Sequence, residues 1–387
     1  MKILIVNRYM SIYGGAETVV RELAANLKNL GVKNLIIALN ISEEVKRNCR
    51  SLDIATPEEE FTYKFRSTNF VSSLGIVREI RALRALVKKY ASEFDLINVH
   101  NFPAEWITAG LNKPVVWMCN EIPDFYNNPE PSLAIKLLRS FGIVVDKFMV
   151  NKFIDTICVA DEFNAQRVFE RYGLSSSKVN YGIECGFFSK DNKSEEIIKK
   201  YKLEGSFLLL QVGMLSPEKD QLKSVRALDA LKDEIPNIKL VLAGRPESPY
   251  DSLLEDYIVK RGLEKLVIFT GHIPKDEVRS LYHISKIALF PVKTQGGWLS
   301  PFEALCAGKP IVTSSTMGAA SIIKKEDIGV VSDGLVTAIR DIYNKYDFYL
   351  AMAERGRLWV KNNLTWESFT KKMVKIFEEA LYNRRKV

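Results

Sequence analysis

The sequence predicts an α/β fold built from two Rossmann-like domains, and two patterns carry this prediction. Short apolar runs rich in Ile and Val alternate with longer amphipathic stretches, and the same alternation begins again after residue 190. Runs that are apolar on both faces are typical of parallel strands covered by helices. Their alternation with helices indicates a doubly wound sheet in each half, and a length of 387 residues fits two domains.

The strands of the two predicted sheets are short and well separated. In the first half they are residues 2–7, Asn34–Leu39, Leu96–Val99, Val115–Met118 and Thr156–Val159, with a helix from about Glu17 to Leu30. In the second half they are Phe207–Val212, Lys239–Ala243, Leu266–Phe269, Ile287–Phe290 and Pro310–Thr313.

The polar and charged segment Ser189–Lys200 is interpreted as a linker between the halves. The stretch from Thr365 to about Asn383 is amphipathic and follows a complete second domain. We therefore expect a first domain over residues 1–187, a second over 188–364, and a helix over 365–387 that packs back on the first.

Composition limits the partners and the compartment. A net charge of +8 suits an anionic partner such as a nucleotide diphosphate or an acidic membrane surface. The basic residues are too interspersed with acids to indicate nucleic acid. The apolar run at residues 3–6 is shorter than a secretory signal requires, and no window approaches the roughly 20 apolar residues of a membrane span. The sequence therefore predicts a cytoplasmic protein, with peripheral contact on the inner membrane face left open.

Cysteine and histidine usage indicates neither disulfides nor a metal site. The cysteines are odd in number, far apart and without a Cys-x-x-Cys pair, which favours buried free thiols in a reducing compartment. His100, His272 and His283 have no metal-ligand spacing.

Ligands of parallel sheets bind beyond the carboxyl ends of the strands. In each half, a glycine-containing loop follows the first strand. Gly14 and Gly15 precede the first helix, where paired glycines and a helix N-terminus favour a phosphate. The alternative is a plain turn with Glu17 as a capping residue. The loop Gly213–Asp220 places Lys219 where it can neutralise a diphosphate, although a solvated surface lysine is equally compatible with the sequence.

A third loop runs from Pro291 to Leu305 and gives the strongest pattern. Adjacent glycines precede a helix that is expected to open with Ser300 as N-cap and Pro301 in the first turn. Glu303 then falls in that first turn, where a carboxylate can accept two ribose hydroxyls. The alternative is a capping box between Glu303 and Ser300.

The segment Gln295–Val312 reads QGGWLSPFEALCAGKPIV and resembles the E-G-F-G-L-x-x-x-E-A-x-A-x-G-x-P-V-V signature of retaining glycosyltransferase family 4. The resemblance extends over most of the chain. It includes V-x-F-x-G at 267–271, L-Y at 281–282, Gly244 after the preceding strand, Gly182-Ile183-Glu184 in place of N-G-V-D with Tyr181 where Asn is usual, and the Gly14–Glu17 loop.

The resemblance implies a GT-B fold, with two domains facing each other across a cleft, and a nucleotide-sugar donor bound by the second. Glu303 would hold the ribose and Lys219 the diphosphate, while Gly296 and Gly297 would contact the phosphates and sugar and Gln295 the transferred sugar. The remaining donor-binding residues would be Gly14, Gly15, Gly213, Gly244, Arg245, His272, Trp298 and Leu299. The absence of an Asp-x-Asp triplet in the sequence predicts that no cofactor or obligatory metal is needed.

Three positions depart from the family pattern. Gln295 replaces a glutamate, and an amide supplies no negative charge to a developing oxocarbenium ion. Met214 stands where an arginine is usual, with Arg245 as first and Lys293 as second candidate substitute. Asn120 stands where many members carry a histidine.

The catalytic set is therefore expected to include Gln295, Glu303 and Asn120. Two neighbouring side chains complete it. Glu121 is an acid that can orient the acceptor or act as a base, and His100 can supply an imidazole from the next strand end.

Two stretches combine basic and apolar residues in the way that is typical of helices that dock on anionic lipid head groups. Ser73–Tyr90 carries Arg78, Arg81, Arg84, Lys88 and Lys89, and Ser132–Lys152 carries Lys136, Arg139, Lys147 and Lys152. Ordinary helices that pack an apolar stripe on a sheet are the alternative.

The function predicted from the sequence is retaining transfer of a hexosyl group (mannosyl, glucosyl or galactosyl) from a GDP- or UDP-sugar to a glycan or lipid-linked acceptor in cell-surface polysaccharide or glycolipid synthesis. A nucleotide-sugar epimerase and a non-catalytic sugar-nucleotide-binding relative are the alternatives.

Overall fold

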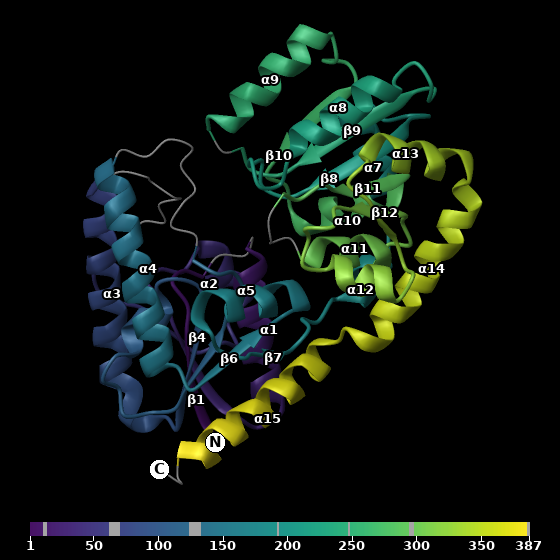
Figure 1. Cartoon of the computed structure of the whole chain (residues 1–387). Helices are drawn as coiled ribbons and strands as arrows, with labels where there is room; N and C mark the ends of the chain where they lie inside the picture. The colour runs from purple at the N-terminus through teal and green to yellow at the C-terminus, as the bar shows by residue number, and fades with distance from the viewer. Residues whose placement is uncertain are drawn as a thin grey trace. The chain divides into compact units, whose positions relative to one another are not determined.

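A computed structural model describes residues 1–10, 14–61, 70–123, 133–191, 193–246, 248–293 and 298–384. The chain forms two compact units (Figure 1). The first unit comprises Met1–Gly182 and Trp366–Val387, and the second comprises Ile183–Thr365. Each unit is a parallel β-sheet covered by helices, as the alternation of apolar runs predicted.

The sheet of the first unit has the strand order β3-β2-β1-β4-β5-β6-β7, and all neighbours are parallel. Its strands are β1 (Lys2–Val6), β2 (Lys33–Ile37), β3 (Ile54–Ala55), β4 (Leu96–His100), β5 (Val115–Met118), β6 (Thr156–Val159) and β7 (Ser177–Lys178). Its helices are α1 (Gly15–Asn29), α2 (Glu43–Asn48), α3 (Phe70–Tyr90), α4 (Leu133–Phe153), α5 (Glu162–Tyr172) and α15 (Trp366–Arg384), with short 3-10 turns η1 (Ala91–Glu93) and η2 (Ala104–Thr108).

The sheet of the second unit repeats this topology, with the order β10-β9-β8-β11-β12-β13. Its strands are β8 (Phe207–Val212), β9 (Ile238–Ala243), β10 (Val267–Gly271), β11 (Ile287–Phe290), β12 (Ile311–Thr313) and β13 (Val330–Val331). Its helices are α6 (Cys185–Phe188), α7 (Ser194–Tyr201), α8 (Gln221–Leu231), α9 (Tyr250–Arg261), α10 (Lys275–Ile284), α11 (Leu299–Cys306), α12 (Ala320–Lys325), α13 (Leu335–Asn344) and α14 (Tyr346–Asn363).

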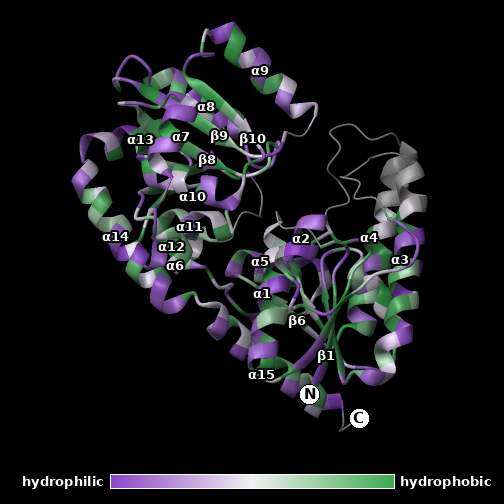
Figure 2. Cartoon of the chain, turned by 180° about the vertical axis from the view of Figure 1, so that it is seen from behind, coloured by the Kyte–Doolittle hydropathy of each residue, from purple (hydrophilic) through white to green (hydrophobic). Residues whose placement is uncertain are grey.

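Hydrophobic burial explains these elements. Every residue of β4 is buried, and so is every residue of β11, as expected for central parallel strands. Helix α1 buries one stripe, formed by Val19, Val20, Leu23, Ala24 and Leu27. Figure 2 shows the same distribution of hydropathy, with largely hydrophobic strands and amphipathic helices.

The boundary between the units differs from the predicted one at residues 187 and 188. The second unit already begins at Ile183, because α6 packs against α11 and α14. The segment Ser189–Lys200 is not a linker either. It contains most of α7, which buries Ile197 and packs on α10.

The C-terminal helix α15 belongs to the first unit and packs against α1 and β5. Its buried residues include Phe369, Met373 and Phe377. Gly182 lies so close to the start of this helix that an added Cβ would sit 2.3 Å from the backbone nitrogen of Trp366. The first unit is therefore completed by a segment that follows the whole second unit in sequence.

The expectation of free thiols throughout is wrong for two cysteines, because Cys185 of α6 and Cys306 of α11 form a disulfide. Their separation of 121 residues hides this pairing in the sequence. Cys49, Cys119 and Cys158 are free. Among the described residues, none of the helices is long and apolar enough to cross a membrane.

Both sheets have a point at which the strand order reverses. It lies between β1 and β4 in the first unit and between β8 and β11 in the second. Ligands of doubly wound sheets bind at such switch points, beyond the carboxyl ends of the strands. The loops that leave β1, β4, β8 and β11 are therefore the places to look for a site.

Candidate active site

In the second unit, the loops after β8 and β9 are in direct contact. The amide of Gly213 donates to the carbonyl of Ala243 at 2.9 Å, and Leu215 N donates to Arg245 O at 2.9 Å. A Cβ at Gly244 would lie 1.9 Å from the carbonyl oxygen of Gly213. Glycine is therefore required at 244 for the two loops to meet.

The loop that carries Lys219 is held by hydrogen bonds to the side chains of two buried glutamines. Gln211 Nε2 donates to the carbonyl of Lys219 at 2.7 Å, and its Oε1 accepts from the Ser224 hydroxyl at 2.6 Å. Gln221 accepts from Ser216 N at 3.2 Å and donates to Met214 O at 2.9 Å. The backbone around Lys219 is therefore held before any ligand binds.

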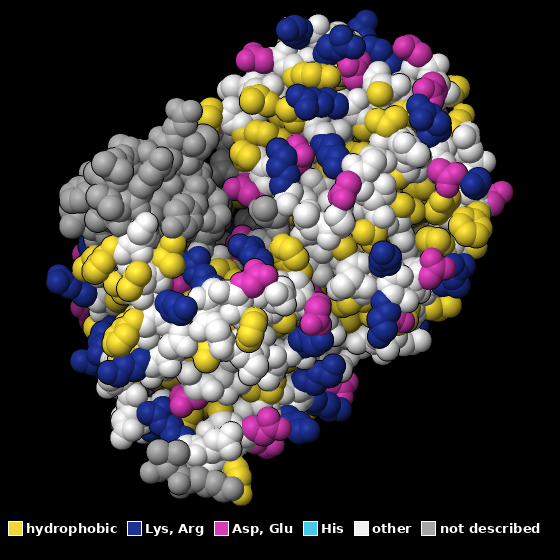
Figure 3. All heavy atoms as spheres, viewed as in Figure 1, with side chains coloured by type: hydrophobic (Ala, Val, Ile, Leu, Met, Phe, Trp, Pro, Cys, Tyr) yellow, Lys and Arg dark blue, Asp and Glu magenta, His cyan; other side chains and the backbone are white. Residues whose placement is uncertain are grey.

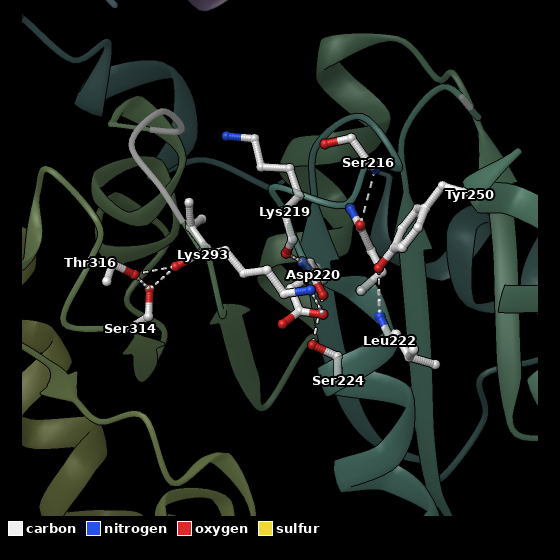
Figure 4. A network of polar contacts seen from close by, with 12 residues as sticks. Ser216, Lys219, Asp220, Leu222, Ser224, Tyr250, Lys293, Ser314 and Thr316 are labelled. Atoms are coloured by element: carbon white, nitrogen blue, oxygen red, sulfur yellow. Dashed lines mark hydrogen bonds and ion pairs between the residues drawn. The ribbon is translucent and has the colours of Figure 1, made fainter. Parts of the chain in front are cut away.

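Across the switch point, Lys293 reaches this loop from the end of β11 (Figure 4). Its amide donates to the carbonyl of Glu218 at 2.8 Å, and its Nζ lies 3.4 Å from Oδ1 of Asp220. Figure 4 shows Lys293 extending toward Asp220, whereas Lys219 extends away from it. The second-ranked substitute for the missing arginine thus lies beside the Lys219 loop.

The residue before Lys293 links this loop to the one that follows β12. The carbonyl of Val292 accepts from the hydroxyl of Ser314 at 2.6 Å and also from the hydroxyl of Thr316. The peptide group between Val292 and Lys293 is thus hydrogen-bonded through both its carbonyl and its amide, which limits the positions that the Lys293 side chain can reach.

Glu303 lies in α11, but not as predicted. The helix begins at Leu299, and Trp298 is its N-cap without a side-chain cap bond. Ser300 is therefore inside the helix and is not the N-cap. Glu303 falls beyond the first turn, so the capping box is wrong as well.

The carboxyl of Glu303 lies in a desolvated setting. Loss of solvent around it is the main cause that raises its pKa to about 7, against which Lys275 and the hydroxyl of Tyr282 favour the ionised form. Glu184, itself paired with Lys275, acts in the opposite direction. A carboxylate in such a site accepts hydrogen bonds strongly once it is ionised.

The other predicted donor residues are distributed unevenly. Arg245 is exposed, and His272 is an exposed residue after β10, the edge strand of the sheet. Trp298 is buried and packs on Phe302 with ring centroids 4.7 Å apart, followed by Leu299 at the start of α11. Gln295, Gly296 and Gly297 lie outside the described residues.

In the first unit, Gly14 is the N-cap of α1 and Gly15 its first residue. The carboxyl of Glu17 folds over Gly14, so that a Cβ there would meet its Oε2 at 1.6 Å. Desolvation raises the pKa of Glu17, while its own backbone amide and Arg21 lower it. Glu17 thus lies at the helix end where the sequence predicted a phosphate.

A chain of side-chain amides spans the carboxyl ends of β1, β4 and β5. The hydroxyl of Tyr181 donates to Asn120 Oδ1 at 2.6 Å, and Asn120 Nδ2 donates to Asn101 Oδ1 at 3.1 Å. Asn101 Nδ2 in turn donates to Asn7 Oδ1 at 2.8 Å, and Asn7 Nδ2 to the carbonyl of Tyr9 at 2.7 Å. This series, called the amide chain below, crosses the switch point of the first unit.

The other two predicted catalytic residues of this unit differ in exposure. His100 is fully buried, and its Nε2 lies 2.8 Å from Asn98 Oδ1. Burial lowers its pKa to about 3, so the imidazole stays neutral. Glu121 is exposed directly after Asn120.

Asn7, Asn101 and Asp220 did not emerge as site residues from the sequence. A usable signal was present for the two asparagines, since Asn7 directly follows β1 and Asn101 directly follows β4. Asn101 also has a left-handed backbone, with φ of 49°, which asparagine adopts more readily than most residues. Among the described residues, no three His, Cys, Asp or Glu side chains gather as a metal site would require.

Family models and solved structures agree with this architecture. Residues 13–181 match the model for Glycosyltransferase Family 4, and residues 193–359 match that for Glycosyl transferases group 1. HepE of Anabaena in complex with UDP and glucose has a TM-score of 0.78 at 16% identity, covering 98% of this chain and 100% of that one. WaaG, a glycosyltransferase involved in lipopolysaccharide biosynthesis, has a TM-score of 0.75 at 17% identity, covering 97% and 99%.

Among curated proteins, the chain is similar to a GDP-mannose-dependent alpha-(1-6)-phosphatidylinositol monomannoside mannosyltransferase of Mycobacterium tuberculosis. The identity is 24% over 235 residues, which is 57% of this chain and 60% of the relative. Putative glycosyltransferase YtcC of Bacillus subtilis is 25% identical over 329 residues, 76% of this chain and 75% of the relative. The chain thus matches about three-fifths of the length of the mycobacterial enzyme. Together with the two matched models, these likenesses show that the chain belongs to glycosyltransferase family 4 and has the GT-B fold.

Proposed function

We propose that the protein transfers a hexosyl group from a GDP- or UDP-sugar to a glycan or lipid-linked acceptor, with retention of the anomeric configuration. The observation that carries the donor half is the Lys219 loop, whose backbone is held in place at the switch point of the second unit. Lys219 supplies positive charge that a diphosphate requires, without a metal ion. Glu303 accepts the ribose hydroxyls. Two comparisons support this class of donor. One relative is named as a GDP-mannose-dependent enzyme, and one structural neighbour was solved in complex with UDP and glucose.

A thermal-shift screen against UDP, GDP, ADP and their sugars tests the donor site. A ligand that binds only the folded state raises its stability by RT ln(1 + [L]/Kd), so the true donor should raise the melting temperature. Glu303→Ala should lose that shift, whereas Glu264→Ala, an exposed position in the same unit, should retain it. Equal shifts in both variants would remove Glu303 from the ribose site.

Product analysis tests the chemistry separately from binding. Incubation with the sugar nucleotide and acceptor should yield a glycoside with the donor's anomeric configuration, and turnover should persist in EDTA. Conversion of the sugar nucleotide without acceptor would indicate an epimerase instead. Binding without any product from a panel of acceptors would favour a sugar-nucleotide-binding relative.

We also propose that helix α4 docks on an anionic membrane surface where a lipid-linked acceptor resides. Phe141, Val144 and Phe148 are exposed by 68%, 66% and 55%, and their spacing places them on one face. Exposed Lys147 and Lys152 flank this face, and Lys152 lies over the ring of Phe148. Aromatic and basic side chains together suit the interface of an anionic bilayer. Figure 3 shows hydrophobic and basic side chains interspersed in this part of the surface.

Helix α3 contributes less than the sequence suggested. Arg84 donates to the carbonyl of Ile107 at 3.0 Å, and Arg78 pairs with Glu59. Arg81, Lys88 and Lys89 are exposed, and the side chains of Lys136 and Arg139 in α4 lie outside the described set. Among the described side chains of α3, however, Val77 is the only exposed large hydrophobic one, so the docking proposal rests on α4.

Co-sedimentation with anionic and neutral liposomes tests the membrane proposal. The double variant Phe141→Ser/Phe148→Ser should lose binding to the anionic vesicles. Phe348→Ser, which removes a ring exposed by 57% in α14, should bind as the wild type does. Equal, negligible binding of the wild type to both vesicles would remove the proposal.

A further inference from the structure

Lys293 stands out because its ammonium group is held by a carboxylate that has no other described ion pair. The side chain of Asp220 is only 12% exposed, whereas that of Lys293 is 57% exposed. Asp220 occupies the N-cap position of α8 but makes no side-chain cap bond, and its backbone is left-handed, with φ of 51° and ψ of 50°. This carboxylate is therefore not serving the helix end, as an N-cap aspartate usually does.

The location of the pair gives it a meaning for ligand binding. Lys219 and Asp220 follow β8, and Lys293 follows β11, the two strands on either side of the switch point. The two lysines approach from separate loops (Figure 4), and the backbones of both loops are fixed by the hydrogen bonds described above. A diphosphate placed at this switch point meets one positive charge from each loop.

We propose that Lys293 is the second phosphate-binding cation of the donor site and that Asp220 is its counter-ion in the absence of ligand. When a diphosphate binds, the ammonium of Lys293 transfers from the carboxylate of Asp220 to a phosphate oxygen. Asp220 thereby lowers the affinity for the diphosphate, because its charge both competes for Lys293 and repels the phosphates. This inference rests on the proposed use of a nucleotide-diphosphate donor.

The structure favours Lys293 over Arg245 for this part. Arg245 is exposed on the loop after β9, a strand away from the switch point. The backbone of Lys293 is bonded to Glu218, directly before Lys219, whereas the backbone of Arg245 is bonded to Leu215 near the start of the same loop. Because the bond to Glu218 holds the backbones of the two lysines close together, both cations can bind the diphosphate of a single ligand.

Titration calorimetry with UDP, GDP and ADP tests the assignment. Lys293→Gln should weaken the binding of whichever nucleoside diphosphate the wild type binds by about tenfold, the scale of one charge-assisted contact. Asp220→Asn should tighten it several-fold, and asparagine tolerates the left-handed backbone at this position. Lys265→Gln, an exposed lysine of the same unit, should bind as the wild type does.

The corresponding nucleosides serve as the second probe, since they lack phosphate and should bind all variants alike. Wild-type affinity for the diphosphate in Lys293→Gln, or weaker binding in Asp220→Asn, would overturn the inference while leaving the donor proposal intact. If the folded wild type binds none of the three diphosphates, both this inference and the proposed function are wrong. Binding that depends on Lys293 without any sugar transfer would uphold the inference and remove the transferase proposal alone.

Discussion

The hydroxyl of Tyr181 donates to Oδ1 of Asn120 at 2.6 Å, and both residues depart from the pattern that the sequence resembles. The sequence treats these departures as independent, because 61 positions separate them. In the structure they are partners, and Asn120 is held between Tyr181 and Asn101. Its second amide hydrogen has no acceptor among the described residues, and an amide does not accept a proton as a base at neutral pH. Asn120 is therefore suited to hold an oxygen of a ligand in place.

Tyr181→Phe should lower the free energy of unfolding by about 1–2 kcal/mol, since it leaves the partly buried Oδ1 of Asn120 without its donor. Urea unfolding measures the change. Tyr343→Phe is the matched control, because the Tyr343 ring packs on Phe207 while its hydroxyl makes no hydrogen bond within the described part of the chain. A loss no larger than that of the control would mean that the hydroxyl contact contributes nothing.

The pairing also predicts coupling between two substitutions. Asn120→His alone should reduce transfer activity, because the larger imidazole replaces an amide that is hydrogen-bonded to both the Tyr181 hydroxyl and Asn101. Adding Tyr181→Asn, which restores the usual residue at both positions, should recover part of the loss. A double-mutant cycle on kcat/KM measures the coupling, expected at 0.5 kcal/mol or more for residues in contact. Strict additivity would show that the two positions act separately.

Glu303 should give donor binding and stability opposite responses to pH. Its pKa is raised from 4.5 to about 7, so the carboxylate that accepts ribose hydroxyls is lost as the pH falls through 7. Donor affinity should fall accordingly, and Glu303→Gln should remove this pH dependence. Nucleotide titrations between pH 5.5 and about 8.5 measure it. An unchanged profile in Glu303→Gln would assign the titration to another group.

The stability effect has the reverse sign. Because the folded-state pKa lies above the unfolded one, the contribution of Glu303 to stability is fully present below pH 4.5 and is lost as the pH rises to about 7. Glu303→Gln should therefore gain on the wild type over this window, by at most about 3 kcal/mol. The difference between the two unfolding curves isolates this residue from the other acids.

The Cys185–Cys306 disulfide predicts a thiol count. Under denaturing, non-reducing conditions, Cys49, Cys119 and Cys158 should react with a thiol reagent, and reduction should release two more. Cys306→Ser should lower stability by roughly 2–4 kcal/mol under oxidising conditions, and addition of dithiothreitol should abolish its difference from the wild type. Cys49→Ser is the control outside the bond. Full reactivity before reduction would show that the bond does not form.

Gly244→Ala should disrupt the loop contact beneath the donor site. The added Cβ would lie 1.9 Å from the carbonyl oxygen of Gly213, a backbone atom that cannot rotate away. We expect a loss of stability above 2 kcal/mol, the scale of overpacking that forces backbone shifts, and a loss of donor binding. Gly186→Ala is the matched control, because no atom lies within 4 Å of a Cβ there. Similar melting temperatures for both variants would contradict the close approach.

The sequence predicted the fold well where burial dominates. β8 and β11 are apolar runs buried by the sheet and its helices, and the structure places both within the predicted bounds. Strands of two residues, such as Val330–Val331, carry too little periodicity to be recognised. Segment Ser189–Lys200 was misinterpreted because one buried side chain, Ile197, suffices to dock a polar helix.

The candidate site was predictable only in part. Lys219 lies in a loop after one predicted strand and Glu303 in the helix after another, and both segments have a recognisable pattern, whereas the contacts around them come from distant positions. Asp220 and Lys293 meet because β8 and β11 are neighbours in the sheet, and the Cys185–Cys306 bond likewise depends on the packing of α6 on α11. Contacts of this kind follow from tertiary structure, which local sequence patterns do not encode.

The amide chain contains no charged group, whereas the switch point of the second unit has an ion pair between the exposed Lys293 and the largely buried Asp220. Dissolved salt screens interactions between exposed charges over distances beyond about 10 Å at 0.1 M and beyond about 3 Å at 1 M, but leaves hydrogen bonds between neutral amides nearly unchanged. High ionic strength should therefore weaken the binding of an anionic ligand at the second unit and leave the binding of a neutral glycan unchanged. We therefore expect the KM for the donor to rise with added salt and the KM for a neutral acceptor to stay constant. Measuring both KM values over a range of salt concentrations would distinguish the charged binding site from the neutral one.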